Sequence, residues 1–161
     1  MELIEIAQVN DALAEMVALF RVELRSYKGI VSKPNIEAGR EEMEEYLAAN
    51  FPVFAAVVDG KYAGYVVCRI DSEVVWVESI FVREEHRRCG VASALHSRAE
   101  KIAASYGNDT VYNYVHPNNH RMIEFLRKRG YTVLNLIEIR KPYQGEKLTQ
   151  TITVGEHEFD Y

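Results

Sequence analysis

Hydrophobic residues in the first fifty positions recur at helical spacing. Apolar side chains return every three or four positions after Asn10, which predicts a helix that this residue caps and that ends near Ser26. A second helix is expected over roughly Asn35 to Ala49, after the loop SYKGIVSKP. A short strand over Leu3 to Ile6 precedes both helices. The chain therefore begins with one strand and two amphipathic helices.

The spacing changes to a strand pattern after residue 50. The run FPVFAAVVDGKYAGYVVCRI predicts two strands joined at Asp59-Gly60, a dipeptide that favours the tight turn of a hairpin. The run SEVVWVESIFV predicts a third strand. Hairpin connections of this kind indicate an antiparallel meander.

Strands and helices alternate in the second half. A helix is expected from about Cys89 to Tyr106, with Gly107 ending it, and another begins at Asn118 or Asn119 and ends in RKRG. The runs TVYNYV, YTVLNLIEIR and KLTQTITV predict strands, the last two of which close the sheet. A helix that crosses over between strands makes the middle pair parallel. The pattern predicts one α/β (α+β) domain over residues 1–161.

Composition restricts the class of partner. The chain has 161 residues, a formal net charge of -5 and a pI near 5.6, which argues against binding to nucleic acid or to an anionic membrane surface as its main task. Acidic residues interrupt the apolar N-terminal stretch, so we expect no signal peptide or membrane span. Cys68 and Cys89 form no CxxC pair, so we expect neither a disulfide framework nor a metal site. These features predict a cytoplasmic protein.

Gly90 stands where a strand gives way to a helix. A helix N-terminus presents unpaired N–H groups and a partial positive charge, so residues 88 to 93 form a candidate anion site. A glycine there lets a ligand touch the backbone. The spacing fits neither a Walker loop nor a dinucleotide fingerprint. An ordinary turn between strand and helix is the alternative.

Three motifs in this region resemble the GNAT superfamily of N-acetyltransferases. The segment RRCGVA, residues 87 to 92, matches the R/Q-x-x-G-x-G/A signature, and VESIFV resembles the strand before it. Asn119, Phe125, Gly130 and Tyr131 resemble the second motif of the family. The resemblance implies a mixed, mostly antiparallel sheet of six to seven strands, with a splayed parallel central pair and about four helices on both faces. It also implies acetyl-CoA as cosubstrate.

The resemblance assigns residues to the cofactor. In the family the two central strands separate and pantetheine pairs with the exposed backbone, while the loop binds the pyrophosphate. It implies cofactor contacts by Ile80, Phe81, Val82, Arg87, Arg88, Cys89, Gly90, Val91, Ala92, Ser93 and Asn119.

Glu78 is the candidate general base. It lies in an apolar strand, where an unpaired carboxylate is costly, and a glutamate at the matching place in relatives takes or relays the proton. The alternative is a glutamate at a strand edge that faces water or is bonded to a bulge. His116 is the second candidate. Many relatives carry a tyrosine that protonates the leaving thiolate, and this chain has Leu126 at that position, so Tyr112, Tyr114 and Tyr143 are candidate phenols unless the thiolate leaves unaided.

Two classes of function remain open. The first is transfer of the acetyl group to a primary amine of a small molecule, a peptide N-terminus or a lysine, by direct attack in a ternary complex. The second, motivated by Leu126, is a catalytically silent module that binds acyl-CoA and regulates a partner. The loop SYKGIVSKPN and the segment KPYQGEK are expected to select the acceptor. The family also makes a homodimer through the C-terminal strands an option.

Overall fold

The computed structural model describes all 161 residues and forms two compact units. The first comprises Met1–Tyr114 and the second Val115–Tyr161. The single domain expected over residues 1–161 stays a prediction. None of the helices combines the length and the apolar character that crossing a bilayer requires.

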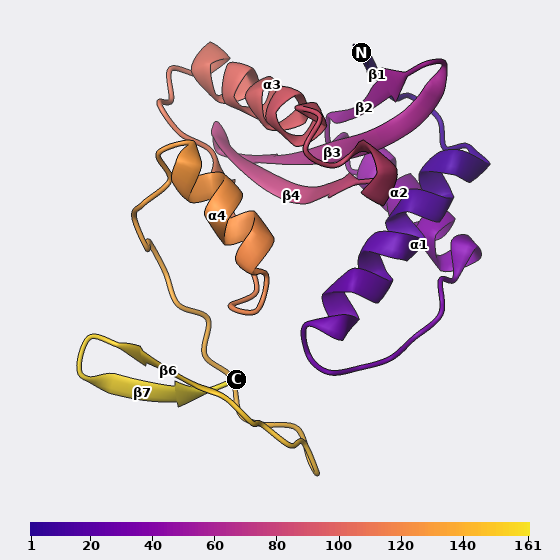
Figure 1. The fold of residues 1–161 in the computed structure, drawn as a ribbon. Helices are drawn as coiled ribbons and strands as arrows, with labels where there is room; N and C mark the ends of the chain where they lie inside the picture. Colours follow the sequence, from indigo (N-terminus) through magenta and orange to yellow (C-terminus); the bar gives the residue numbers. More distant parts are fainter. The chain divides into compact units, whose positions relative to one another are not determined.

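A five-stranded sheet is the centre of the first unit (Figure 1). Its strands, in both chain and spatial order, are β1 (Glu2–Glu5), β2 (Val53–Val58), β3 (Lys61–Asp71), β4 (Val74–Val82) and β5 (Tyr112–Asn113). Neighbours are antiparallel except β4 and β5, which are parallel. The hairpin predicted at Asp59-Gly60 is confirmed, because both residues have the positive φ of a tight turn.

Two helices pack on one face of this sheet. Helix α1 (Asp11–Ser26) begins after Asn10, and α2 (Ile36–Ala48) begins after Asn35. Each asparagine side chain accepts a hydrogen bond from the N–H three residues on, so both predicted caps are confirmed. Their apolar faces enclose the main core with the side chains of β2 and β3 that point the same way. The core members from these helices and strands are Leu13, Met16, Val17, Met43, Val53, Ala55, Tyr65 and Val67.

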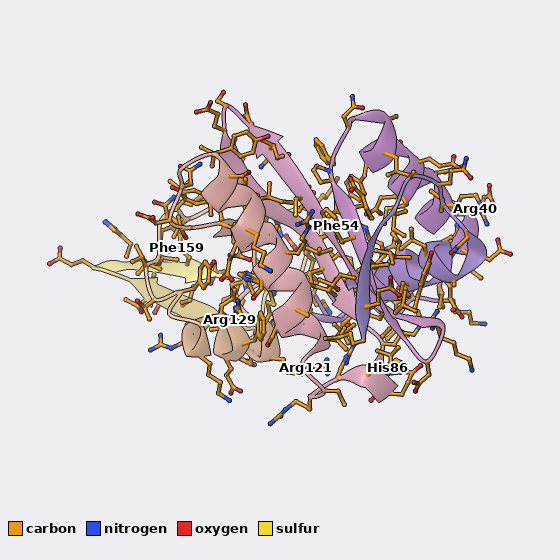
Figure 2. The ribbon with its side chains drawn as sticks, turned by 90° about the horizontal axis from the view of Figure 1, so that it is seen from above. Arg40, Phe54, His86, Arg121, Arg129 and Phe159 are labelled. Atoms are coloured by element: carbon orange, nitrogen blue, oxygen red, sulfur yellow. The ribbon has the colours of Figure 1, made fainter.

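Helix α3 (Val91–Ser105) contacts β2, β3 and β4. Along β3, Val66 and Cys68 point away from the α1 core because side chains alternate across a strand. Gly64 allows α3 to pack closely, since a Cβ there would lie 3.2 Å from a methyl group of Leu95. Phe54, labelled in Figure 2, is buried with the guanidinium of Arg98 4.4 Å from its ring centre. Helices therefore cover both faces, as predicted.

The second unit contains one helix and one hairpin. Helix α4 (His120–Lys128) begins after Asn119, whose side chain caps it as expected. Strands β6 (Thr151–Val154) and β7 (His157–Asp160) form a separate antiparallel sheet, with Gly155 at positive φ in the turn. Together with α1, α2 and α3, helix α4 makes the four helices that were predicted.

Two details of the predicted C-terminal strands were wrong. Residues 131–140 form no strand, and Val133, Leu134 and Leu136 are exposed there. The run KLTQTITV forms β6 only in its second half and pairs with β7, which was not predicted, instead of closing the central sheet. A strand exists only when a neighbour completes its hydrogen bonds, and an alternating pattern does not say which neighbour is present. The fold class itself is confirmed.

Candidate active site

The N-terminus of α3 is open to a ligand. A short 3-10 turn, Glu84–His86, leads from β4 to Gly90, which has φ +83° and no side-chain cap beside it. The first helical hydrogen bond runs from the N–H of Ala94 to the carbonyl oxygen of Gly90. The N–H groups of residues 91 to 93 therefore have no partner within the helix. These donors and the positive end of the helix dipole favour an anion.

The surface at Gly90 is open. A Cβ built at this glycine would meet no protein atom within 4 Å, so the backbone faces solvent directly. Arg88, two residues earlier, also has positive φ, at 64°, which turns the chain sharply before the helix. Arg88 and Cys89 both lie on the surface of this loop, with Cys89 exposed. Main-chain donors at a helix N-terminus beside an unobstructed glycine are typical of phosphate sites.

The side chain of Arg87 is directed into the protein. Its Nε donates to the carbonyl oxygen of Val82 at 2.9 Å, and one terminal nitrogen lies 3.0 Å from a carboxylate oxygen of Glu23 in α1. The guanidinium also lies 5.7 Å from the ring centre of Phe81. Arg87 therefore connects the loop to the end of β4 and to α1. A direct contact between its side chain and the cofactor stays a prediction.

One edge of β4 is unpaired beyond its middle. The parallel pairing with β5 joins Trp76 to Tyr112 and Val77 to Asn113, and it ends there. On the other edge, β3 pairs with β4 as far as Val82. Residues 78 to 82 therefore have a strand on one side only. Apart from the carbonyl oxygen of Val82, which accepts from Arg87, the backbone groups on the open side can pair with a peptide-like ligand. The last three residues of this segment, Ile80, Phe81 and Val82, are those predicted to pair with pantetheine.

The side chains of Ile80, Phe81 and Val82 belong largely to the protein interior. Phe81 and Val82 are buried, and Ile80 is half-buried. Phe81 packs against the rings of Phe20 and Tyr65. A ligand at this edge would thus use backbone groups, while the side chains stabilise the strand.

Glu78 lies at an irregularity in β4. The register pairs Ser79 with Val67 and Val77 with Cys68, so Glu78 has no opposite residue on β3 and is the extra residue of a bulge. Its Oε2 accepts a hydrogen bond from Nε of Arg69 at 3.0 Å, and both side chains are 28% exposed. Bulges frequently re-aim a side chain next to an active site. The carboxylate is paired and partly accessible to solvent.

Three aromatic rings adjoin this ion pair. Trp76 lies 4.7 Å from Tyr112 and 5.0 Å from Tyr114, measured between ring centres, and its ring is nearly parallel to that of Tyr114. The guanidinium of Arg69 lies 5.0 Å from the centre of the Trp76 ring. We call Arg69, Trp76, Tyr112 and Tyr114 the aromatic cluster.

The aromatic cluster lies on the same face of the sheet as the core beneath α1 and α2. Tyr65 and Val67 point into the core beneath α1, and alternation along β3 places Arg69 on the same face. Burial and the hydrogen bond to Glu42 raise the pKa of Tyr46 in α2, and the charge of Glu78 adds to this shift. Glu78 is thus close enough to α2 for its charge to be felt there.

A buried histidine connects α3 to β5. His96 is completely buried, and its Nε2 lies 3.2 Å from Oδ1 of Asn113. Glu100, one turn along α3, lies 3.4 Å from Nδ1 of the same ring. Because β5 has only two paired residues, this contact helps to fix where β5 leaves β4.

The remaining candidates lie in the second unit. Nδ1 of His116 accepts a hydrogen bond from the N–H of Asn118 at 3.1 Å, so this ring stabilises the turn before α4. The side-chain oxygen of Asn119 is used as the cap of α4. Leu126 is buried. The cofactor role of Asn119 and the base role of His116 stay predictions.

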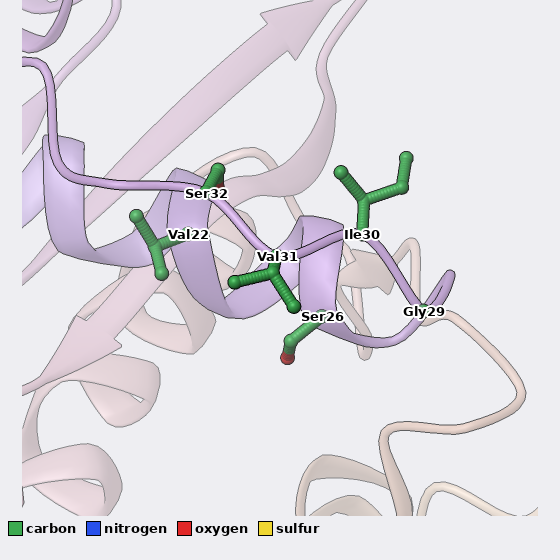
Figure 3. Close-up of a pocket in the computed structure, with 6 residues that line it drawn as sticks. All are labelled: Val22, Ser26, Gly29, Ile30, Val31 and Ser32. Carbon is green, nitrogen blue, oxygen red and sulfur yellow. The ribbon is translucent and has the colours of Figure 1, made fainter.

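The loop between α1 and α2 encloses a small pocket (Figure 3). Its volume is about 250 Å³. The lining residues are Val22, Ser26, Gly29, Ile30, Val31 and Ser32. Most of these residues belong to the first part of the segment SYKGIVSKPN, which was expected to select the acceptor. The pocket wall is mainly apolar.

Three features of the site were not predicted from the sequence: the place of Arg69, the stacking of Trp76 on the tyrosines, and His96. Two signals were present in the chain. Arg69 is a charged residue that directly follows the apolar run YVVC in β3, and Trp76 is the only tryptophan. Their meeting depends on the bulge at Glu78 and on the short pairing with β5, which the hydrophobic pattern does not reveal.

Comparison with known proteins identifies a family. Residues 16–131, more than half of the chain, match the model described as the acetyltransferase (GNAT) family. No curated protein sequence matches the chain.

Solved structures share the fold at low sequence identity. AAC(6')-Iy in complex with the bisubstrate analog CoA-S-monomethyl-acetylneamine has a TM-score of 0.63 and 21% identity, over 89% of this chain and 99% of that one. The apo aminoglycoside antibiotic 6'-N-acetyltransferase AAC(6')-IG from Acinetobacter haemolyticus has a TM-score of 0.62 and 19% identity, over 89% and 99%. The ribosomal-protein-alanine N-acetyltransferase from Brucella melitensis biovar Abortus 2308 has a TM-score of 0.64 and 13% identity, over 88% and 99%. These likenesses establish the fold.

Proposed function

Because the chain belongs to the acetyltransferase (GNAT) family and is thus an acyltransferase that uses acetyl-CoA, we propose that it acetylates a primary amine by direct attack in a ternary complex. The observation that carries this proposal is the unpaired edge of β4, residues 78 to 82, with the open N-terminus of α3 after it and Glu78 at its start. One continuous stretch of chain thus offers a peptide-like edge, an anion site and a carboxylate.

The cofactor would be held mainly by backbone groups. The N–H groups of residues 91 to 93 would bind the pyrophosphate, and Gly90 would let it approach them. The free edge of β4 around Ile80 and Val82 would pair with the pantetheine amides. A backbone N–H at this edge would also polarise the thioester carbonyl.

Glu78 would serve as the proton acceptor. Acetyl-CoA supplies an activated acetyl group, to which the acceptor nitrogen forms a bond as the bond from carbon to sulfur breaks. The nitrogen must lose a proton in this reaction, and the partly exposed carboxylate of Glu78 lies beside the aromatic cluster, where an acceptor would bind. Arg69 would act as a positioning residue, because its hydrogen bond fixes the orientation of that carboxylate.

The thiolate of coenzyme A would leave without a tyrosine at position 126. Leu126 has no proton to donate and is buried. A thiol with an ordinary pKa near 8.5 is a good leaving group, so unaided departure is compatible with turnover. Protonation by solvent would then complete the reaction.

The experiment is an assay of free thiol. The protein is mixed with acetyl-CoA and a panel of primary amines, namely amino acids, polyamines, aminoglycosides and peptides, and the release of coenzyme A is followed. Thiol release that depends on an amine supports the proposal, and the acetylated amine is identified by mass spectrometry. Tight binding of coenzyme A without turnover on any member of the panel would contradict it and favour a silent acyl-CoA-binding module.

A further inference from the structure

Arg69 has hydrogen-bond donors to spare at the candidate site. It uses Nε for its contact with Glu78, and its terminal nitrogens Nη1 and Nη2 donate no hydrogen bond within the protein. The side chain is 28% exposed, so these nitrogens can be reached from solvent. A guanidinium is a planar fork of donors that matches a carboxylate. The surface beside Glu78 therefore offers a site for an anionic oxygen pair.

The aromatic rings extend the surface away from that guanidinium, because Trp76 pairs with Arg69 on β3 at one side and with Tyr112 on β5 at the other. Tyr114 is 63% exposed although one face of its ring is stacked on Trp76 at 5.0 Å. Its other face is therefore available to a ligand. Aromatic side chains stabilise flat groups by stacking and by burying apolar area.

The charges at this place are arranged as a pair of opposite sign. Glu78 would face the reacting nitrogen, and Arg69 lies within hydrogen-bond distance of Glu78. A ligand that carries an amine and a carboxylate a few bonds apart would present the complementary pair to these two residues. A simple amine would satisfy Glu78 alone.

We infer that Arg69 is a specificity-determining residue that binds a carboxylate of the acceptor, so that the preferred acceptors are amino carboxylates. The inference rests on the proposed function, because it names the acceptor class of the same site. It does not depend on which phenol, if any, protonates the thiolate.

The test uses the intrinsic fluorescence of Trp76, which is the only tryptophan and lies inside the cluster. The full chain, saturated with coenzyme A so that no reaction occurs, is titrated with L-phenylalanine and with phenethylamine, which differs only by lacking the carboxylate. A charge-assisted pair predicts a Kd about tenfold or more lower for phenylalanine. The variant Arg69→Gln is expected to reduce this ratio to about twofold or less.

A second variant controls for general damage. Arg40→Gln breaks an ion pair with Asp11 between the two helices, outside the cluster, and should leave the ratio unchanged. Equal affinities for the two ligands in the wild-type protein, or an unchanged ratio in Arg69→Gln, would overturn the inference.

The outcomes separate this inference from the proposed function. Turnover of phenethylamine with a kcat/KM equal to that of phenylalanine would refute the role of Arg69 and leave the acetyltransferase proposal standing. Carboxylate-dependent binding without turnover on any amine would instead refute the proposed reaction, because the binding measurement requires no chemistry.

Discussion

Nε of Arg69 lies 3.0 Å from Oε2 of Glu78, a contact between two strands that forms where a bulge leaves Glu78 without an opposite residue. The contact joins a partly exposed carboxylate to a partly exposed guanidinium at the start of the unpaired edge of β4. This relationship places a base candidate and a carboxylate-binding candidate in one site.

Replacement of Glu78 tests the chemistry. Glu78→Gln keeps the size of the side chain and removes the proton acceptor, so kcat is expected to fall about 100-fold or more, in the range of lost general-base catalysis. The Kd of coenzyme A should stay within about twofold, because the backbone sites are untouched. Steady-state kinetics and calorimetry measure the two quantities.

The matched control is Glu73→Gln, in the exposed turn between β3 and β4, which should leave kcat unchanged. A kcat in Glu78→Gln within about threefold of the wild-type value would show that another group accepts the proton.

The packing of α1 against α2 depends on a glycine. A Cβ at Gly39 would lie 2.3 Å from the carbonyl oxygen of Ala14 and 2.9 Å from the backbone nitrogen of Ala18. Gly39→Ala must push the helices apart, so we expect a loss of about 1–3 kcal/mol in the free energy of unfolding. Urea denaturation measures this loss.

A glycine in the neighbouring loop supplies a comparison. Gly29 has positive φ but no atom within 4 Å of a Cβ, so Gly29→Ala should cost only the backbone strain, about 1 kcal/mol. If Gly39→Ala proved as stable as the wild-type protein, the close contact between the helices would be wrong.

The two cysteines should differ sharply in reactivity. Burial raises the pKa of Cys68 to about 12, whereas Cys89 is exposed in the loop before α3. Only the thiolate reacts, and a raised pKa favours the neutral thiol, so at pH 8 about one Cys68 in ten thousand is ionised. Labelling with iodoacetamide should modify Cys89 alone until the chain unfolds.

The sign of the pH dependence follows from the same shift. Below about pH 8.5, Cys68 is neutral in both the folded and the unfolded state, whereas above it the unfolded thiol ionises first and the fold loses stability. Rapid labelling of Cys68 in the native protein at pH 8, located by peptide mass spectrometry, would contradict the buried position on β3. Labelling in denaturant provides the control for full reactivity.

Local signals predicted most of the first unit. Asn10 and Asn35 mark helix starts because their side chains cap the first turn, and Asp59-Gly60 marks a hairpin because both residues adopt positive φ. Gly90 marks the start of α3, because it has a backbone conformation there that only glycine adopts freely. Each of these features is decided by residues within a few positions of one another.

Features that depend on distant residues could not be predicted. The bulge at Glu78 arises from how β3 and β4 align, and the contact with Arg69 follows from it. The run at 131–140 has a strand-like composition but no neighbour to complete its hydrogen bonds, so it forms no ladder. A hydrophobic pattern indicates which face of a strand or helix is apolar, but it does not indicate which strand or helix packs or pairs with it.

The most direct test of the account is the affinity for coenzyme A of two glycine variants, measured by calorimetry. Gly90 and Gly107 stand at opposite ends of α3 with nearly equal positive φ, +83° and +80°, and a Cβ at either meets no protein atom within 4 Å. Gly90→Leu and Gly107→Leu therefore impose similar backbone strain, but only the first places a side chain over the N–H groups of residues 91 to 93. Gly90→Leu is expected to raise the Kd of coenzyme A about tenfold or more, whereas Gly107→Leu should leave it unchanged. Equal affinities in the two variants would contradict the seating of the diphosphate on the N-terminus of α3.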